Sequence, residues 1–213
     1  MKKLAIIGSG DLGQQIAWHA KQTGRFEVVG FFDDFAQRGE IKHEVSVIGP
    51  TTEIGHAFEK GAFDEIIIAI GYHHLETRSR LFEEWKDRVP FATIIHPNAY
   101  VDSSANIGKG CVIYPGCTVD MLATLQENVL LNVGCVIAHD SLVGKHSFLS
   151  PATKVAGFVT IGECVSLGIG TTIIDNLSLC SNTRTGAGAV VIDHIEIPGL
   201  YVGVPATFKK PNA

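Results

Sequence analysis

A branched aliphatic residue occupies every sixth position over about half of the chain, and this period constrains the fold more than any other feature. A period of six fits neither the 3.6 residues of a helical turn nor the alternation of a lone strand. It is typical of a parallel β-helix, in which each hexapeptide forms one short strand and one tight turn. No insertion shifts the register, and one threonine is the single exception among the repeat positions Ile95, Val101, Ile107, Ile113, Val119, Leu125, Leu131, Ile137, Val143, Leu149, Val155, Ile161, Leu167, Ile173, Leu179, Thr185, Val191 and Ile197.

Small residues predominate four positions after each aliphatic, which suits a narrow prism whose corners hold the aliphatic side chains. Three hexapeptides complete one triangular coil, so residues eighteen apart stack at about 4.8 Å. One coil buries three aliphatic side chains, worth about 5–9 kcal/mol. Ordering its eighteen backbones costs roughly 18–36 kcal/mol. Several coils must therefore form together.

The first ninety residues follow a different pattern. A buried strand over 3–7 leads into the glycine-rich turn 8–13, a helix over about 14–22 follows, and a second strand, 28–32, ends in Asp33 and Asp34. This is the context in which a G-x-G-x-x-G motif indicates a phosphate site. Gly8, Ser9 and Gly10 would present backbone amides to a phosphate, and Asp33 could accept a ribose hydroxyl.

The remainder of this region predicts a strand near 47–48, a helix over 52–59, a strand over 65–70 that Gly71 ends, and a helix over 76–86. Barely one half of a dinucleotide domain is present, which favours a nucleotide site over an NAD site. The alternative, that the glycines serve only a tight turn, remains open. We expect a Rossmann-like α/β half-domain over 1–94 and an all-β parallel β-helix with a tail over 95–213.

Composition limits the partners and the compartment. The net charge is −5 and there is no basic block, so nothing indicates binding to nucleic acid or to an anionic membrane. The N-terminal apolar run is too short for an export signal, and no apolar stretch of eighteen residues exists. The five cysteines include no C-x-x-C pair, which favours reduced thiols in a cytoplasmic protein. A disulfide between Cys117 and Cys135, eighteen residues apart, is the alternative.

Several repeats carry glycine after the aliphatic, as in Ile107-Gly108, Val143-Gly144, Ile161-Gly162 and Leu167-Gly168. In this respect the second half resembles the hexapeptide-repeat acyltransferases. The resemblance implies the left hand of the helix and a homotrimer, neither of which follows from periodicity.

The two halves together resemble bacterial nucleotide-sugar acetyltransferases, the group of the bacillosamine-pathway N-acetyltransferase and its sialic-acid O-acetyltransferase relatives. The resemblance implies acetyl-CoA as co-substrate, a nucleotide-linked amino sugar held by the small domain, a role in cell-surface polysaccharide biosynthesis, and active sites between neighbouring subunits. Asp33 and Asp34 would lie near the base or ribose. The motifs that carry it are GSGDLG at 8–13, Phe31-Phe32-Asp33-Asp34, Ala69-Ile70-Gly71, Ile95-His96-Pro97, Ile137-Ala138-His139-Asp140 and Val202-Gly203-Val204-Pro205-Ala206.

His139 is the candidate general base. It lies between two repeat aliphatics and should project from the prism. An imidazole, which ordinarily titrates near pH 6.5, suits removal of a proton from an attacking amine. The family's base maps to His139, and Asp140 matches the carboxylate that follows it. Asn132 also matches a family active-site position.

Glycines supply the other candidate contacts. Gly157 stands eighteen residues after His139, so its amide could donate to the thioester oxygen. A turn glycine that needs positive φ is the structural alternative. Gly168 with Gly186, and Gly170 with Gly188, form columns without side chains along which a pantetheine arm could lie.

Two departures from the family pattern bear on the substrate. Phe148 stands where the bacillosamine enzyme has a second histidine, and His146 is out of register with that position. Tyr72, His73 and His74 stand where smaller amide residues are expected.

Two alternative functions remain open: an O-acetyltransferase for a sialic-acid-like sugar, and a non-catalytic sugar-nucleotide-binding scaffold. A zinc carbonic anhydrase is disfavoured, because three histidines in one cleft are not indicated. We expect no metal.

Overall fold

The computed structural model describes residues 1–212, which form two compact units: one over Met1–His96, and one that begins at Pro97. The elements of the first unit are β1 (Lys2–Ile7), α1 (Asp11–Gln22), β2 (Phe26–Phe32), β3 (Ile41–Lys42), β4 (Val45–Gly49), η1 (Thr51–Glu53), α2 (Ile54–Glu59), β5 (Glu65–Ile68), η2 (Tyr72–His74), α3 (Leu75–Trp85) and β6 (Ile94–Ile95).

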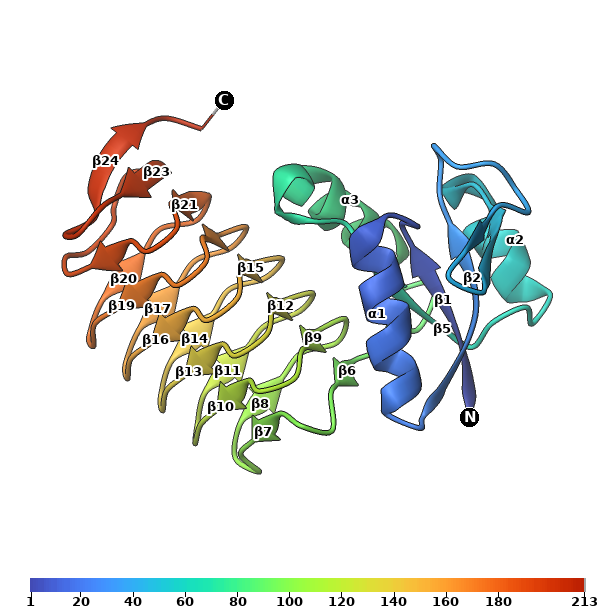
Figure 1. Cartoon of the computed structure of the whole chain (residues 1–213), viewed down its shortest axis with the longest axis horizontal. Helices are drawn as coiled ribbons and strands as arrows, with labels where there is room; N and C mark the ends of the chain where they lie inside the picture. The colour runs from blue at the N-terminus through green and yellow to red at the C-terminus, as the bar shows by residue number, and fades with distance from the viewer. Residues whose placement is uncertain (213) are drawn as a thin grey trace. The chain divides into compact units, whose positions relative to one another are not determined.

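A sheet of order β3-β4-β2-β1-β5 forms the centre of the first unit, with β3 antiparallel to β4 and the other pairs parallel (Figure 1). Alternation along β1 divides its side chains between two faces. Ala5 and Ile7 pack in one cluster with Leu81 and Phe82 of α3. Helix α1 buries Ile16 together with Ala17 and Ala20, which lie on one helical face.

Several predicted boundaries in this unit were wrong. Helix α1 begins at Asp11, directly after the N-cap Gly10, and β5 ends at Ile68. The helix expected over 52–59 begins as the 3₁₀ turn Thr51–Glu53. The sequence interpretation missed the β3–β4 hairpin, whose turn residues His43 and Glu44 both have positive φ.

The second unit is a stack of parallel coils (Figure 1). Its first face contains β7 (Tyr100–Val101), β10 (Thr118–Val119), β13 (Val136–Ile137), β16 (Lys154–Val155), β19 (Thr172–Ile173) and β22 (Val190–Val191). Its second face contains β8 (Asn106–Ile107), β11 (Thr124–Leu125), β14 (Leu142–Val143), β17 (Thr160–Ile161) and β20 (Ser178–Leu179). Its third face contains β9 (Val112–Ile113), β12 (Leu130–Leu131), β15 (Phe148–Leu149), β18 (Ser166–Leu167), β21 (Thr183–Thr185), β23 (Gly199–Val202) and β24 (Thr207–Lys210).

The eighteen-residue spacing between stacked strands is confirmed. Thr118 pairs with Val136 and Val119 with Ile137, for example, and β13 pairs with β16 in the same register. Thr185, the exception in the repeat, is buried, and its hydroxyl hydrogen-bonds that of Thr171 at 2.7 Å. A polar residue is tolerated at this repeat position because its hydroxyl is paired inside the prism.

The expectation that the aliphatics stand at the corners was wrong. Each aliphatic from Ile95 to Val191 ends a two-residue strand, as Ile137 ends β13, and the turn lies two and three residues later, at His139 and Asp140. The third residue after the aliphatic adopts positive φ in coil after coil. Ile197 was also misplaced, because it lies outside the strands and is 64% exposed.

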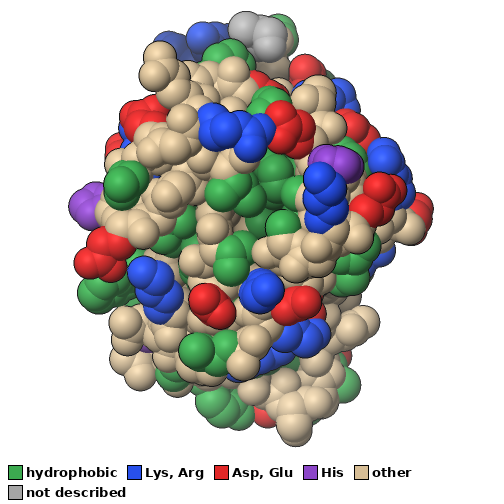
Figure 2. Space-filling view, turned by 90° about the vertical axis from the view of Figure 1, so that its right-hand side faces the viewer, with side chains coloured by type: hydrophobic (Ala, Val, Ile, Leu, Met, Phe, Trp, Pro, Cys, Tyr) green, Lys and Arg blue, Asp and Glu red, His purple; other side chains and the backbone are tan. Residues whose placement is uncertain are grey.

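Basic and acidic side chains are interspersed on the face in Figure 2. None of the helices over 1–212 has the length and apolar character needed to cross a membrane. Cys117 and Cys135 are free thiols rather than a disulfide. Cys164 and Cys180 are partly exposed.

Candidate active site

The glycine-rich turn of the first unit is shaped by close backbone approaches. Gly8 has a φ of +100°, and a Cβ there would lie 2.9 Å from the carbonyl oxygen of Ala69. A Cβ at Gly13 would lie 2.0 Å from the carbonyl oxygen of Gly8. Gly10 and Gly71 meet no such obstacle. Gly8 and Gly13 are therefore required as glycine by the fold itself, independently of any ligand that the turn binds.

Asp33 joins the end of β2 to this turn. Its Oδ2 accepts hydrogen bonds from the amide and the hydroxyl of Ser9, both at 2.7 Å, and its Oδ1 accepts one from the amide of Phe35 at 2.9 Å. Burial alone would raise the pKa of Asp33, but the hydrogen bonds from Ser9 and the following loop outweigh it and hold that pKa below its ordinary value.

Two further groups fix the loops around the turn. Asp34 accepts hydrogen bonds from the amide and hydroxyl of Thr51, at 2.7 Å and 2.9–3.0 Å, which ties it to the start of η1. Arg78 of α3 is fully buried and donates to the carbonyl oxygens of Ile68 and Ile70, at 3.1 and 3.2 Å. Arg78 thus holds the chain just before Gly71. Sequence reasoning missed both contacts.

Helix α1 begins at the glycine turn with an extended N-cap, Gly10, and no side-chain cap. Its first backbone amides therefore have no partner within the helix and point toward the turn. Such a terminus favours an anion. Asp11, in the first turn of α1, adds a negative charge beside it.

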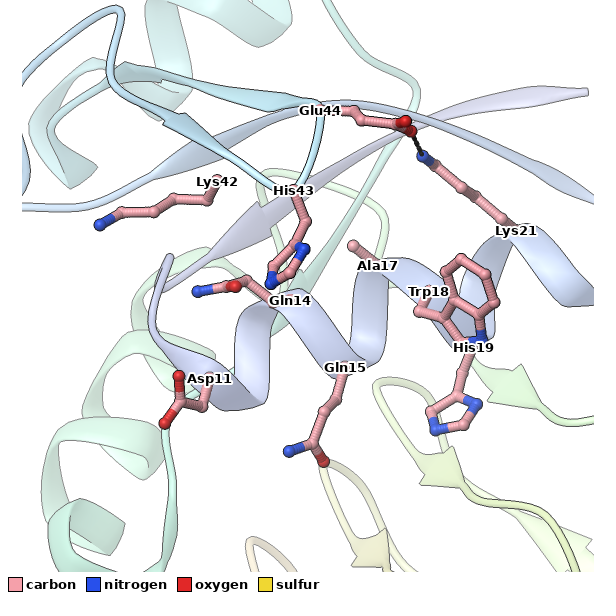
Figure 3. Close-up of a pocket in the computed structure, with 10 residues that line it drawn as sticks. All are labelled: Asp11, Gln14, Gln15, Ala17, Trp18, His19, Lys21, Lys42, His43 and Glu44. Carbon is pink, nitrogen blue, oxygen red and sulfur yellow. Dashed lines mark ion pairs between the residues drawn. The ribbon is translucent and has the colours of Figure 1, made fainter.

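A cavity of about 500 Å³ lies between α1 and the β3–β4 hairpin (Figure 3). His43, from the hairpin turn, points toward α1, and Lys21 forms an ion pair with Glu44 at 3.7 Å. Gln14 lines the cavity and donates to the carbonyl oxygen of Ser9 at 3.1 Å, so the cavity adjoins the glycine turn. The lining residues are Asp11, Gln14, Gln15, Ala17, Trp18, His19, Lys21, Lys42, His43 and Glu44.

In the second unit, His139 stands on the turn between the first and second faces. We call this column of turns, residues 121–122, 139–140, 157–158 and 175–176, the histidine corner. The Nδ1 atom of His139 lies 3.0 Å from Oδ2 of Asp140, and the two side chains are 45% and 33% exposed. The prediction that His139 projects outward agrees with this exposure.

Gly157 provides the surface against which the imidazole lies. A Cβ at this position would be 2.7 Å from Cε1 and 2.8 Å from Nε2 of His139. Its φ is not in the positive range, so the alternative of a positive-φ turn glycine was wrong, and Phe158 holds that conformation instead. Over residues 1–212, no carbonyl or side chain accepts from the Gly157 amide.

The other candidate contacts of this unit lie elsewhere. Asn132, Gly168, Gly186 and Gly188 belong to the turns between the third and first faces, residues 132–134, 150–152, 168–170 and 186–188, which we call the asparagine corner. Oδ1 of Asn132 accepts from the amide of Val133 at 2.7 Å. One chain therefore does not bring Asn132 to His139, because a whole face of the prism, roughly 20 Å at 3.3 Å per residue, separates the corners.

Packing explains part of the glycine column at the asparagine corner. A Cβ at Gly168 would lie 2.6 Å from the backbone carbon of Gly186, and one at Gly186 would lie 2.8 Å from the side chain of Val202. Gly188 has a φ of +67° and open space around it. The first two glycines are thus required by coil stacking, and the last by backbone conformation.

Comparisons with known proteins bear on the fold and on the class of enzyme. Residues 3–85 match the family described as the PglD N-terminal domain. A histidine-to-alanine variant of GDP-perosamine N-acetyltransferase from Caulobacter crescentus, in complex with CoA and GDP-perosamine, is 27% identical with a TM-score of 0.92, over 99% of this chain and 98% of that chain. The acetyltransferase domain of PglB from Neisseria gonorrhoeae is 28% identical with a TM-score of 0.89, over 98% and 100%.

The chain is a sugar acetyltransferase with a left-handed β-helix. WeeI from Acinetobacter baumannii, 20% identical with a TM-score of 0.82 over 98% of this chain and 100% of that chain, has the same fold. A sequence search of curated proteins finds no match. The family resemblance and fold class predicted from the sequence are therefore confirmed.

This acetyltransferase departs from expectation near the base. Phe148 lies in β15 on the third face, where it is buried, and not at the histidine corner. His146 lies 3.0 Å from the side-chain nitrogen of Asn128, through Nδ1. In residues 1–212 no cluster of three or more His, Cys, Asp or Glu could hold a metal ion. Sequence reasoning did not single out Phe158, although its position eighteen residues after Asp140 places it in the same column of turns.

Proposed function

We propose that this protein transfers an acetyl group from acetyl-CoA to the amino group of a nucleotide-linked amino sugar, with His139 as general base. The observation that carries the proposal is the His139–Asp140 pair on an exposed turn, 3.0 Å apart and next to an unpaired glycine amide. The similarity to enzymes solved with CoA and GDP-perosamine, or with acetyl coenzyme A, supports the same substrate classes.

The imidazole is oriented by its neighbour. When Nδ1–H donates to Asp140, the other nitrogen, Nε2, is left as the acceptor. Asp140 thereby selects the tautomer in which Nε2 can take a proton. The side chain is exposed, so an amine can reach it from solvent.

The reaction then needs no acylated side chain. The lone pair of the sugar amine forms a bond to the thioester carbonyl carbon, and the carbonyl oxygen becomes an oxyanion. The Gly157 N–H donates to that oxygen, a contact typically worth about 10²–10³ in rate. His139 removes the proton from the nitrogen, the carbon–sulfur bond breaks, and the proton passes to the CoA sulfur. The buried thiol of Cys135, whose pKa is raised by its hydrogen bond to Cys117 and by burial, plays no part.

The first unit would hold the nucleotide. The amides of Gly8 and Ser9 already donate to Phe32 and Asp33, so the amide of Gly10 and those at the start of α1 are the ones that suit a diphosphate. The free lone pairs of Asp33 and Asp34 would accept ribose or base donors, and Gly71, which has no side chain, would let the ligand approach the chain after β5.

Two corners of one prism do not meet, so we further propose a homotrimer in which the histidine corner of one copy faces the asparagine corner of the next. Asn132, Gly168, Gly186 and Gly188 would then contact the coenzyme and sugar from the neighbouring copy. Light scattering should give about three times 22.9 kDa.

Subunit mixing tests this shared site. Differently tagged His139→Ala and Asn132→Ala chains, each nearly inactive alone, should regain activity when co-expressed. About a quarter of the sites in a random population of trimers combine two intact corners, and one site in three does so in every trimer that contains both chains. Trimers purified through both tags should therefore show about a third of wild-type activity. Mixed trimers without any gain, or a monomer at micromolar concentration, would exclude the shared site.

The substrate class is tested with a panel of nucleotide-linked amino sugars, and matching sugars that carry hydroxyl but no amine, incubated with acetyl-CoA. Release of CoA thiol and mass spectrometry of the product report transfer. Acetylation of the amines alone supports the proposal, and acetylation of hydroxyls alone indicates an O-acetyltransferase. Binding of the sugar without transfer would indicate a scaffold.

A further inference from the structure

The histidine corner holds an aromatic contact that the proposed mechanism does not use. Phe158 stands one coil beyond Asp140, directly after Gly157, and is 55% exposed. Its ring meets the imidazole of His139 nearly at right angles, at 86°, with the ring centroids 5.2 Å apart. This is the edge-to-face arrangement that aromatic rings prefer.

The backbone of Phe158 is strained. Its φ is +58°, in the left-handed region, where a bulky side chain is an outlier. Asp140 and Asn176, one coil before and after at this corner, share that conformation and are residue types that tolerate it, whereas Leu122, two coils before, has a φ of +57° and is not such a type. A phenylalanine is thus a poor choice for the turn itself, and the contact of its ring with His139 gives the position a reason.

Three neighbours surround the imidazole. The hydrogen bond from Nδ1 to Asp140 fixes one ring atom, and Gly157, without a side chain, supports one face of the ring. One hydrogen bond leaves the exposed ring free to swing toward solvent. The ring of Phe158, set across the imidazole, blocks that swing.

We propose that Phe158 is a positioning residue that holds the His139 imidazole with Nε2 facing the acceptor amine. The proposal rests on the assignment of His139 as base. It predicts that stability and turnover move in opposite directions when the ring is removed, because the strain and the contact have opposite effects.

The decisive variant is Phe158→Asn, which removes the ring and supplies a residue suited to positive φ. The thermal midpoint should rise, while kcat falls about tenfold through misplacement of the base. KM for both substrates and the midpoint of the pH profile should not change. Phe158→Tyr, which keeps the ring, should keep kcat. The control is Cys164→Asn, with a φ of +54° at another corner, where Asn182 already stands one coil further on. It should raise the midpoint without lowering kcat.

A second readout does not depend on turnover. In ¹³C-histidine-labelled protein, the ring current of Phe158 should displace the Cε1–H resonance of His139, which is assigned by its loss in His139→Gln. Phe158→Asn should return that resonance to the position of an exposed histidine.

The outcomes separate this inference from the proposed function. An active wild type with unchanged kcat in Phe158→Asn would overturn the positioning role and leave the base assignment intact. A wild type that acetylates none of the sugars would remove the proposed function. The chemical shift of the His139 Cε1–H would then be the remaining test, and a shift that is the same in wild type and Phe158→Asn would overturn the inference.

Discussion

Asp33 and Asp140 are both carboxylates beside a candidate ligand site, and the chain uses them in opposite ways. Asp33 accepts three hydrogen bonds from its own chain, from the amide and hydroxyl of Ser9 and from the amide of Phe35. Asp140 accepts from His139 on an exposed turn. The first carboxylate shapes a loop during folding, whereas the second orients one side chain that solvent and substrate can reach.

This difference separates stability from chemistry. Removing Asp33 leaves the buried Ser9 without its acceptor, so the fold around the glycine turn should weaken together with ligand binding. Removing a residue of the histidine corner breaks no buried contact, so turnover should fall while the fold stays intact. Four measurements would break or sharpen this comparison.

The largest effect is expected from His139→Ala. It should lower kcat by about 10²–10⁴, the usual worth of a general base. The thermal midpoint and the affinity for acetyl-CoA should scarcely change, because the side chain is 45% exposed. Steady-state kinetics and calorimetry test both statements. Retention of more than about a third of kcat would mean that positioning alone drives the reaction.

A smaller loss is expected from Gly157→Ala. The new methyl group would stand 2.7 Å from Cε1 of His139, so the imidazole must move, and kcat should fall about 10- to 100-fold. The backbone conformation suits alanine, so the midpoint should not fall. In a His139→Ala background the same change should cost little more, and additive losses in this cycle would show that Gly157 acts independently of the imidazole.

Asp33→Ala should change both ligand binding and the stability of the fold. KM for the sugar nucleotide should rise about tenfold, and the free energy of unfolding should drop by about 1–3 kcal/mol because Ser9 loses its acceptor. Asp87→Ala, which removes an exposed carboxylate of the same unit, is the control. Unchanged stability with a raised KM would mean that Asp33 serves the ligand alone.

The smallest effect is the pH dependence of that stability. The pKa of Asp33 is depressed in the folded chain, so its contribution is present above the unfolded value of about 3.9 and is lost as pH falls through the folded pKa. The stability difference between wild type and Asp33→Asn, measured by urea unfolding, should shrink from pH 5 toward pH 2. A constant difference across that range would contradict the assignment.

The β-helix could be predicted because a period of six residues fits neither a helix nor a lone strand. The period alone does not show which residue of each repeat lies at the turn. The aliphatics were placed at corners, although Gly134, Asn128 and Asn176 three residues after them marked the turns, since glycine and asparagine tolerate positive φ. That regularity would also have placed Phe158 in the left-handed region.

The first unit was harder to predict for two physical reasons. The β3–β4 hairpin turns at His43 and Glu44, which lack the usual Asn-Gly signal, so the cavity they line was missed. The glycine motif correctly indicated a tight turn before a helix. That Asp33 would bind Ser9, twenty-four residues away, follows from the juxtaposition of two strand ends and not from either segment alone.

The unbroken pairing of strands eighteen residues apart makes the second unit a molecular ruler. Each added coil moves a corner residue by one graduation of about 4.8 Å and leaves its orientation unchanged. An eighteen-residue insertion after Val119 would shift His139 one graduation away from β7, whereas a six-residue insertion would rotate it onto another face. Evolution can therefore tune the reach of such a site in discrete steps, by duplicating coils, without redesigning the turn that carries the chemistry.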